Sequence, residues 1–282
     1  MKRIIEFIVY TNIWVAIAVS SLCWFTGLLI ENVDFNFIYF SFFATLLMYA
    51  YARWFSSPSR EDDATSKLTD WASHNRLINI ASGLIGAVGA IWFALSLNRL
   101  TLIWLLICGG ISALYPLQFF KHGQLALRNI AGLKLFVISA IWAIVTVILP
   151  VTQVNQELSF DIILLTIQRF LFVMAITIPF DIRDLRIDHP DINTLPYRMG
   201  VKASRNFALL TLLIAEGGAV FMFFSHTISI AILIGQLIAY EITSLFIYRS
   251  SPNKPDLFFS FGVEGTSVLL FLMVYIFNYF WP

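Results

Sequence analysis

Charged residues are scarce in this sequence. Asp, Glu, Lys and Arg make up 12% of its 282 residues, hydrophobic residues make up 59%, and the mean hydropathy is +0.80. A soluble domain carries about 25% charged residues, so the composition excludes a secreted enzyme, a cytoplasmic domain and a disordered chain. The few charges leave long uncharged runs: 7–30, 35–52, 77–98, 100–120 and 135–156. Each run can cross a bilayer, which takes roughly 20 helical residues.

Cysteine is scarce as well. The two cysteines, Cys23 and Cys108, lie inside uncharged runs, and we interpret them as small buried hydrophobic residues, not as a disulfide or a metal pair. Lys2 and Arg3 precede an apolar run, as in a signal peptide, but the run is too long and has no small-residue cleavage site. We therefore expect a retained first helix.

The uncharged runs predict an all-α, polytopic membrane bundle of about nine transmembrane helices. No polar stretch reaches the roughly 50 residues that a soluble domain needs, so we expect a single transmembrane domain over residues 1–282. The predicted spans are roughly 8–30, 36–55, 77–97, 100–120, 132–154, 159–180, 205–225, 228–248 and 258–280.

The basic residues predict the orientation of this bundle. Of the 18 Lys and Arg residues, Arg99 falls on the outer side and Arg169 within a span, which leaves 16 on the side of the amino terminus. The positive-inside rule makes that side cytoplasmic and the carboxyl terminus external. The longest connections, 56–76 and 181–204, lie on the same side, so we expect chemistry or recognition at the inner face.

Three carboxylates gather at the inner end of the sixth span. At about 100° per residue, Asp181, Asp184 and Asp188 share one helical face within roughly 60°. Unneutralised acids would repel one another, and Mg²⁺, which takes carboxylate oxygens and bridges to substrate phosphates, would resolve the conflict. The alternative is an amphipathic cap in which Arg183 and Arg186 pair with the acids. The same arithmetic points both arginines away from the acidic face, which weakens this alternative without removing it.

Basic residues follow the acids closely. Arg198 and Lys202 belong to the next inner segment, with Arg205 a few residues on. Guanidinium and ammonium groups bind phosphate oxygens through charge-assisted hydrogen bonds. Metal-binding acids next to phosphate-binding bases predict a site for a diphosphate group.

This stretch resembles a known family. The pattern Asp-x-x-Asp-x-x-x-Asp at 181–188, followed by Thr-Leu-Pro-x-Arg-x-Gly at 194–200, is similar to the second aspartate motif of the UbiA superfamily of intramembrane prenyltransferases. The resemblance implies nine helices, an inward-facing polar cap and a lipid-facing cavity. It also implies transfer of a polyprenyl group from its diphosphate to an acceptor, with aromatic compounds among the candidates.

The resemblance also implies roles for individual residues. Asp181, Asp184 and Asp188 would be the catalytic residues and would hold Mg²⁺, which favours departure of the diphosphate. Three basic residues would bind the diphosphate, the last of them after a looser match at Tyr115-Pro116-Leu117: Arg198, Lys202 and Lys121.

The first aspartate motif of the superfamily is missing from its expected place. Where the second span meets its inner loop, the sequence reads Tyr49-Ala50-Tyr51-Ala52-Arg53. We expect Arg53 to contact the diphosphate directly, because a guanidinium supplies positive charge without a metal. A second interpretation is that acids of the following loop, which lack the motif's spacing, replace the missing ligands: Glu61, Asp62, Asp63 and Asp70.

Ionisable residues inside the predicted spans are functional suspects by default. Arg169, Glu216, Glu241 and Glu264 lie there. Arg169 and Glu264, together with Lys134 at the start of the fifth span, are candidates for lining a cavity. Alternatively, Arg169 pairs with one of the glutamates inside the bundle, because a lone buried charge is costly.

The sequence thus favours a prenyltransferase with Mg²⁺ as cofactor. Its expected partners are an isoprenyl diphosphate, an unidentified acceptor and the lipid bilayer, and nucleic acid is not among them. A non-catalytic UbiA-like protein that binds or transports an isoprenoid or another lipid is the second interpretation. A secondary transporter comes third, because the inverted repeats typical of that class are not evident in the sequence.

Overall fold

Helices make up nearly all of the chain that the computed structural model describes, which comprises residues 2–55, 71, 74–114, 132–185 and 194–281. No strand occurs within these residues. The expected all-α architecture is therefore confirmed for the described part of the chain.

The helices follow the uncharged runs of the sequence. Their bounds are α1 (Lys2–Tyr10), α2 (Ile13–Leu29), α3 (Phe35–Phe55), α5 (Arg76–Ala94), α6 (Arg99–Leu114), α7 (Leu133–Ala143), α8 (Leu149–Gln153), α9 (Phe160–Asp184), α10 (Leu195–Phe224), α11 (Ile230–Arg249) and α12 (Glu264–Phe280). Two π-helical segments adjoin them, η2 (Ile144–Ile148) between α7 and α8, and η3 (Phe258–Val263) before α12.

The number of membrane spans agrees with the expectation of about nine. Within the described residues, seven helical segments are long and apolar enough to cross a membrane, and the bent pair α1 and α2 makes an eighth. The remaining predicted span, 100–120, corresponds to the shorter apolar helix α6, and its last residues lie outside the described part of the chain. The protein is an integral, multi-pass membrane protein.

Local signals place several helix ends. The Ser159 hydroxyl accepts a hydrogen bond from the Ile162 amide at the start of α9, at 3.4 Å. Ser229 does the same for Ile232 at the start of α11, at 3.3 Å. Both serines satisfy amide groups that the first helical turn leaves without a partner.

The first span is broken between α1 and α2, which meet at 68°. Asn12 lies at the break with φ of 66° and ψ of 6°, a left-handed conformation that asparagine tolerates better than most residues. The Ser82 hydroxyl on α5 donates to the Thr11 carbonyl at 2.9 Å and ties the break to the bundle.

Glycines allow the closest helix contacts. A Cβ atom at Gly86 of α5 would lie 2.7 Å from the Leu47 amide nitrogen of α3, and one at Gly235 of α11 would lie 2.8 Å from the Val274 Cα of α12. Small residues at these two positions let the helix backbones approach closely, as is common between membrane helices. Cys23 and Cys108 are free and buried, as expected.

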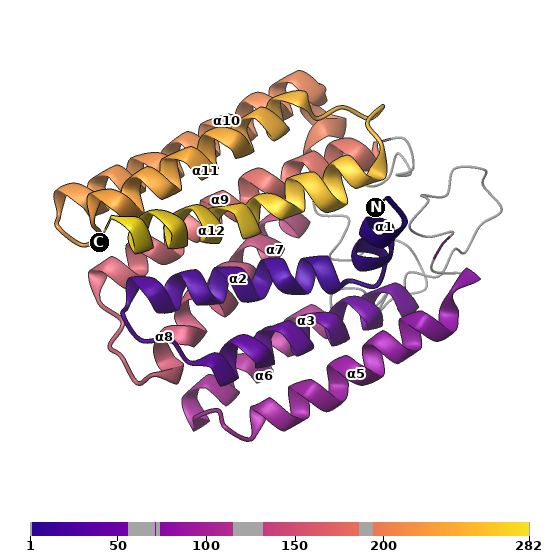
Figure 1. Cartoon of the computed structure of the whole chain (residues 1–282). Coiled ribbons are helices and arrows are strands. Elements are labelled where there is room, and N and C mark those ends of the chain that lie inside the picture. Colours follow the sequence, from indigo (N-terminus) through magenta and orange to yellow (C-terminus); the bar gives the residue numbers. More distant parts are fainter. Residues whose placement is uncertain (1, 56–70, 72–73, 115–131, 186–193, 282) are drawn as a thin grey trace.

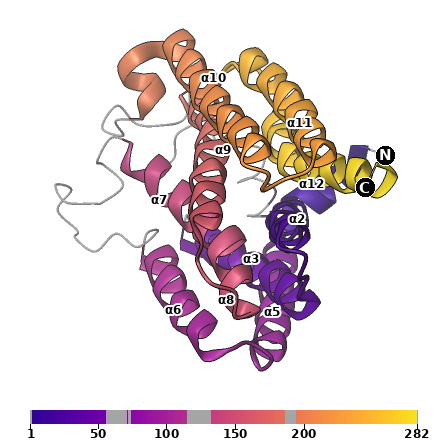
Figure 2. The ribbon, with the colours of Figure 1, turned by 90° about the vertical axis from the view of Figure 1, so that its left-hand side faces the viewer.

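Helix α9 occupies the middle of the bundle. Figures 1 and 2 show α10, α11 and α12 on one side of it and α3, α5 and α6 on the other, with α2 near the centre. Phe172, Ile178 and Ile182 of α9 are completely buried. The amino terminus and the carboxyl end of the chain lie at opposite ends of the bundle (Figure 1).

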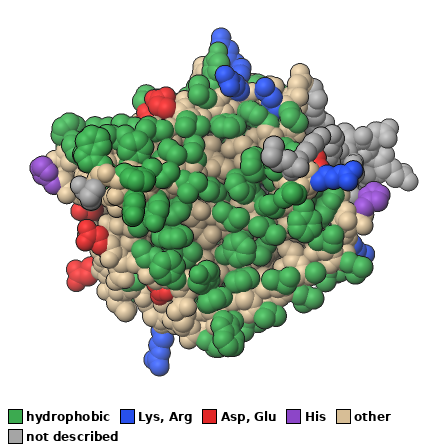
Figure 3. Space-filling model, viewed as in Figure 1, with side chains coloured by type: hydrophobic (Ala, Val, Ile, Leu, Met, Phe, Trp, Pro, Cys, Tyr) green, Lys and Arg blue, Asp and Glu red, His purple; other side chains and the backbone are tan. Residues whose placement is uncertain are grey.

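The surface is apolar where a soluble protein would be polar. Leu84, Val88 and Trp92 on α5 are 62%, 70% and 71% exposed. On the face shown in Figure 3, hydrophobic side chains cover the middle of the molecule and most charged side chains lie toward its edges. This distribution is expected of helices whose outer faces contact lipid.

Candidate functional site

A cavity of about 320 Å³ lies among α2, α3, α7, α9, η3 and α12. Its charged lining residues are Arg53, Lys134, Arg183, Asp184 and Glu264. Apolar side chains from α7 and α9 complete much of the wall, among them Ile138, Trp142, Val173, Ile176 and Phe180. A polar end next to an apolar wall is the arrangement that an amphiphilic ligand needs.

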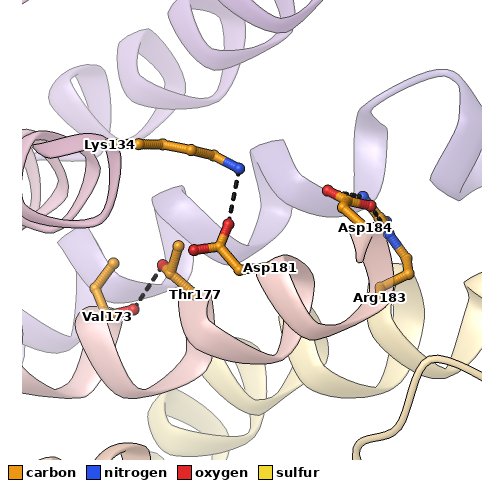
Figure 4. A network of polar contacts seen from close by, with 6 residues as sticks. All are labelled: Lys134, Val173, Thr177, Asp181, Arg183 and Asp184. Carbon is orange, nitrogen blue, oxygen red and sulfur yellow. Dashed lines mark hydrogen bonds and ion pairs between the residues drawn. The ribbon is translucent and has the colours of Figure 1, made fainter. Parts of the chain in front are cut away.

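Asp181 is paired with Lys134 across 47 residues of sequence. The Lys134 ammonium donates to Asp181 Oδ1 at 2.9 Å, and the Asp181 side chain is 4% exposed while that of Lys134 is 35% exposed. Figure 4 shows Lys134 reaching from α7 toward α9. Lys134 lies in the first turn of α7, which begins after Gly132, the N-cap residue with φ of 77°.

Asp184 is paired with the residue just before it. Arg183 Nε donates to Asp184 Oδ1 at 2.7 Å and Nη2 donates to Oδ2 at 3.2 Å (Figure 4). The expectation that Arg183 points away from the acids is wrong, because α9 ends at Asp184 and a long guanidinium side chain can fold around the helix end. Arg183 Nη1 also reaches Ser260 Oγ of η3 at 3.5 Å.

Arg53 occupies the place where the first aspartate motif is missing. It lies in the last turn of α3, lines the cavity, and donates from Nη1 to the Tyr10 carbonyl at the end of α1. The structure therefore brings Arg53, Lys134, Arg183 and Asp184 to one cavity, with Asp181 bound to a residue of its wall.

Glu264 enters the cavity from the first turn of α12. The segment before it is held by Trp14, whose Nε1 donates to the Phe261 carbonyl at 3.0 Å and whose ring stacks on the Phe261 ring at 4.6 Å. Ser260, one turn earlier, lines the same cavity. The π-helical segment η3 directly precedes Glu264, and such segments are frequent at functional sites.

Arg169 lies away from the cavity. It is 2% exposed, and its Nη1 donates to the Leu22 carbonyl at 3.1 Å and to Thr146 Oγ1 at 3.3 Å, with the guanidinium 4.9 Å from the Phe25 ring centroid. Within the described residues no carboxylate lies within 4.0 Å of it, so the alternative interpretation, pairing with a glutamate, does not occur there. A carbonyl, a hydroxyl and an aromatic face stand where a counter-ion would, while Nη2 has no hydrogen-bond partner within the described residues. Arg169 is not among the cavity-lining residues, so its expected place in the cavity is wrong.

Arg198 and Lys202 are exposed near the start of α10 and do not line the cavity. The chain is kinked at Gly200, where φ is 80° and ψ is 162°. Arg205, on the same helix, donates from Nη1 to the Tyr248 carbonyl of α11 at 2.8 Å.

Several predicted site residues lie outside the described part of the chain: Asp188, Lys121, Arg186, Glu61, Asp62, Asp63 and Asp70. Within the described part, no group of three His, Cys, Asp or Glu residues could hold a metal ion. Of the three carboxylates predicted to bind Mg²⁺, the described part of the chain therefore contains Asp181 and Asp184.

Sequence reasoning missed Asn12 as a cavity residue. Asn12 is 1% exposed and lines the cavity, and its Nδ2 has no hydrogen-bond partner within the described chain. The signal was weak: a polar Thr11-Asn12 pair inside the first apolar run. The sequence does not reveal that the helix breaks there.

Comparison with known proteins agrees with this architecture. The model of the UbiA prenyltransferase family matches residues 74–275. A structure described as that of digeranylgeranylglyceryl phosphate synthase is 14% identical with a TM-score of 0.60, and 98% of each chain is covered. A UbiA homologue from Archaeoglobus fulgidus, described as bound to GPP and Mg²⁺, is 13% identical with a TM-score of 0.56 and covers 98% of each chain.

A second structure of an Archaeoglobus fulgidus UbiA homologue, described as bound to DMAPP and Mg²⁺, is 14% identical with a TM-score of 0.52. It covers 98% of this chain and 97% of that one. No curated protein matches the sequence. The family match spans most of the chain, and the protein belongs to the UbiA prenyltransferase family.

Proposed function

We propose that the protein transfers an isoprenyl group from its diphosphate to an acceptor within the membrane. The observation that carries this proposal is the cavity, in which Arg53, Lys134 and Arg183 meet an apolar wall. Cationic N–H groups suit a diphosphate, and an apolar wall suits an isoprenyl chain. The similar structures described with GPP or DMAPP support the same donor class.

The charges of the site support a divalent cation. The three cations face three carboxylates, Asp181, Asp184 and Glu264, so their formal charges cancel. A diphosphate adds negative charge that the side chains do not balance. Mg²⁺ commonly binds one or two carboxylates plus substrate phosphates. Asp184 lines the cavity, and Asp181 lies three residues before it on α9, so both could serve once their cationic partners turn to the diphosphate. Together with Asp188 they are our candidates, and the ion would withdraw charge from the leaving diphosphate.

The basic side chains of the cavity would also stabilise the negative charge of the leaving diphosphate. Lys134 and Arg183 donate to carboxylates here, and the same N–H groups can donate to phosphate oxygens as negative charge develops on them. The Arg53 guanidinium, on α3, is the third cation that could bind the diphosphate. We also propose phosphate contacts for the three basic residues outside the described cavity lining: Arg198, Lys202 and Lys121.

The proposed orientation places the cavity end of the bundle in the cytoplasm. The carboxyl terminus then lies on the external side, since the two ends of the chain lie at opposite ends of the bundle (Figure 1). A reporter fused after Pro282 is expected to behave as external and one inserted at 191–198 as cytoplasmic. If both report the same side, the nine-span topology is wrong.

A second candidate function is binding of an isoprenoid or another lipid without turnover. Two observations favour it: Arg53 stands where an acid is expected, and both described acids of α9 already have cationic partners. Binding without catalysis needs the apolar wall and the cations only.

Release of diphosphate distinguishes the two functions. The purified protein, in liposomes made from a total membrane lipid extract that supplies acceptors, is incubated with geranyl diphosphate and Mg²⁺, with and without a chelator. Binding of geranyl diphosphate and release of free diphosphate are both measured. A transferase releases diphosphate only with Mg²⁺, and Asp184→Asn lowers the rate by about 100-fold. Asp161→Asn, at the opposite end of α9, is the matched control. Binding without release indicates the second function, and absence of binding contradicts both.

A further inference from the structure

One wall of the cavity contains polar groups to which no contact with the diphosphate or with Mg²⁺ is assigned above. Asn12 lies at the break before α2, and Ser260 and Glu264 lie one turn apart at the start of the last span. The other wall is formed by α7 and α9, which contain the two ion pairs described above, Lys134 with Asp181 and Arg183 with Asp184. The two walls meet where Arg183 Nη1 approaches Ser260 Oγ at 3.5 Å.

Glu264 differs from the two acids of α9. Asp181 accepts from Lys134 and Asp184 accepts from Arg183, whereas within the described chain no hydrogen bond or ion pair reaches the Glu264 carboxylate. Its backbone is held in place, because a Cβ atom at Gly265 would lie only 3.0 Å from the Trp14 ring. The cavity thus contains one fixed carboxylate with free acceptor capacity.

Asn12 contributes a donor without a partner. Its side chain is 1% exposed, it lines the same cavity, and Nδ2 makes no hydrogen bond within the described residues. A buried donor left without a partner destabilises the structure, and a ligand oxygen would satisfy it. The left-handed backbone at Asn12, with φ of 66°, is what turns the chain at this point.

We propose that Asn12 and Glu264 bind a hydroxyl group of an uncharged acceptor and that Glu264 takes up its proton. A hydroxyl oxygen accepts one hydrogen bond and donates another, which matches an amide N–H and a carboxylate. A carboxylate acceptor would instead bring a second negative charge to Glu264 and would offer it no proton. The acceptor class is therefore an alcohol or a phenol.

This inference rests on the proposed prenyl transfer and completes its proton balance. The hydroxyl oxygen forms a bond to C1 of the isoprenyl group, while the bond from C1 to the diphosphate oxygen breaks and its electron pair leaves with the diphosphate. The hydroxyl proton passes to the Glu264 carboxylate. The products are an ether, diphosphate and a protonated Glu264, which returns its proton to water when the product leaves.

The first part of the test measures donor binding alone. Geranyl thiolodiphosphate, which resists cleavage, is titrated by calorimetry into the protein in nanodiscs. Asn12→Gly is expected to bind it within about threefold of the parent, a difference of less than 1 kcal/mol. Glu264→Gln, which removes a negative charge from the cavity, is expected to bind it at least as tightly as the parent. Glycine suits the positive φ of position 12, so Asn12→Gly removes the carboxamide without straining the break. A parent that does not bind the analogue contradicts the proposed function itself.

The second part measures transfer from geranyl diphosphate to two lipid-soluble acceptor probes, dodecan-1-ol and 4-dodecylphenol, with dodecanoate as the matched anionic probe. Mass spectrometry is expected to detect ethers and no ester. Glu264→Gln is expected to slow ether formation by about 100-fold or more, as for loss of a general base. Glu264→Asp is expected to restore part of the rate, and Asn12→Gly to raise KM for the alcohol more than it lowers kcat.

Four results overturn the acceptor assignment while leaving donor binding intact. They are ester formation at the rate of ether formation, an unchanged rate in Glu264→Gln, an unchanged KM in Asn12→Gly, and a parent that binds the thiolodiphosphate but forms no ether from either hydroxyl probe.

Discussion

Two groups of charges along α9 are built in different ways. At the carboxyl end of the helix, Asp181 and Asp184 are paired with Lys134 and Arg183, and both cations line a cavity. Arg169 lies 12 residues before Asp181, about 18 Å along the helix axis, where a carbonyl, a hydroxyl and the Phe25 ring surround it. A charge inside a membrane span is thus a candidate ligand only when a cavity reaches it, and Arg169 serves the packing of the bundle.

The largest effect expected from this comparison is on stability. Arg169→Ala removes the largest of the fully buried side chains and is expected to cost about 3 kcal/mol of unfolding free energy. Unfolding in detergent measures this loss, and Arg169→Met, which keeps most of the volume, is expected to lose less. Binding of the thiolodiphosphate stays within about threefold. Weaker binding at unchanged stability would assign Arg169 to the site.

Charge reversal in the cavity is expected to act on binding. Arg53→Asp replaces a cation by an anion where the diphosphate is proposed to bind, and weakens binding of the thiolodiphosphate by about 100-fold, or 2.7 kcal/mol. The control is Arg99→Asp, an exposed arginine at the opposite end of the bundle. Tighter binding in Arg53→Asp would mean that the acids at 61–63 replace the ligands of the missing first aspartate motif.

Neutralising Lys134 is expected to have a smaller effect. Lys134→Met removes one of three cations and leaves Asp181 without its partner, which weakens binding by about tenfold. Adding Asp181→Asn to the same chain removes the unpaired carboxylate and recovers part of the affinity if charge balance is the cause. Lys254→Met, an exposed lysine, serves as the control. If Lys134→Met, the double variant and Lys254→Met all bind the thiolodiphosphate equally well, the Lys134–Asp181 pair does not contact the ligand.

The smallest effect is expected for an exposed cation. Lys202 lies outside the cavity lining near the start of α10, and water and salt screen its charge. Lys202→Met is expected to weaken binding of the thiolodiphosphate by about twofold, and the difference from the parent should vanish at high salt. A loss as large as that of Lys134→Met would show that the start of α10 closes on the ligand.

Much of the fold is predictable from local patterns. The uncharged runs predict helices close to the observed bounds of α2, α9, α11 and α12, because about 20 apolar residues form a spanning helix in any tertiary context. The break at Asn12 and the two π-helical segments were not predicted. They depend on contacts such as that of Trp14 with Phe261, which lie 247 residues apart in the sequence.

The site was predicted in part, and the errors have a common cause. Helical periodicity placed Asp181 and Asp184 at one helix end, but it also pointed Arg183 away from them. Periodicity fixes the direction of Cβ and not the path of a long side chain. Arg183 lies in the last turn of α9, and its guanidinium bends back to Asp184. The alternative pairing of Arg169 with a glutamate is not found in the described chain, because a carbonyl oxygen, a hydroxyl and a ring face surround its guanidinium instead, with Nη2 left without a hydrogen-bond partner there.

Sequence alone determined that this protein spans a membrane many times, where its helices run, and which end carries acids and bases together. Hydropathy and the helical period are local properties, and a bilayer leaves few other structures for such segments. The tertiary structure decided which charges meet: Lys134 with Asp181, Arg53 with the Tyr10 carbonyl, and Glu264 with no partner in the described chain. These choices depend on how helices distant in sequence pack, and close packing is set by the shapes of all the side chains together.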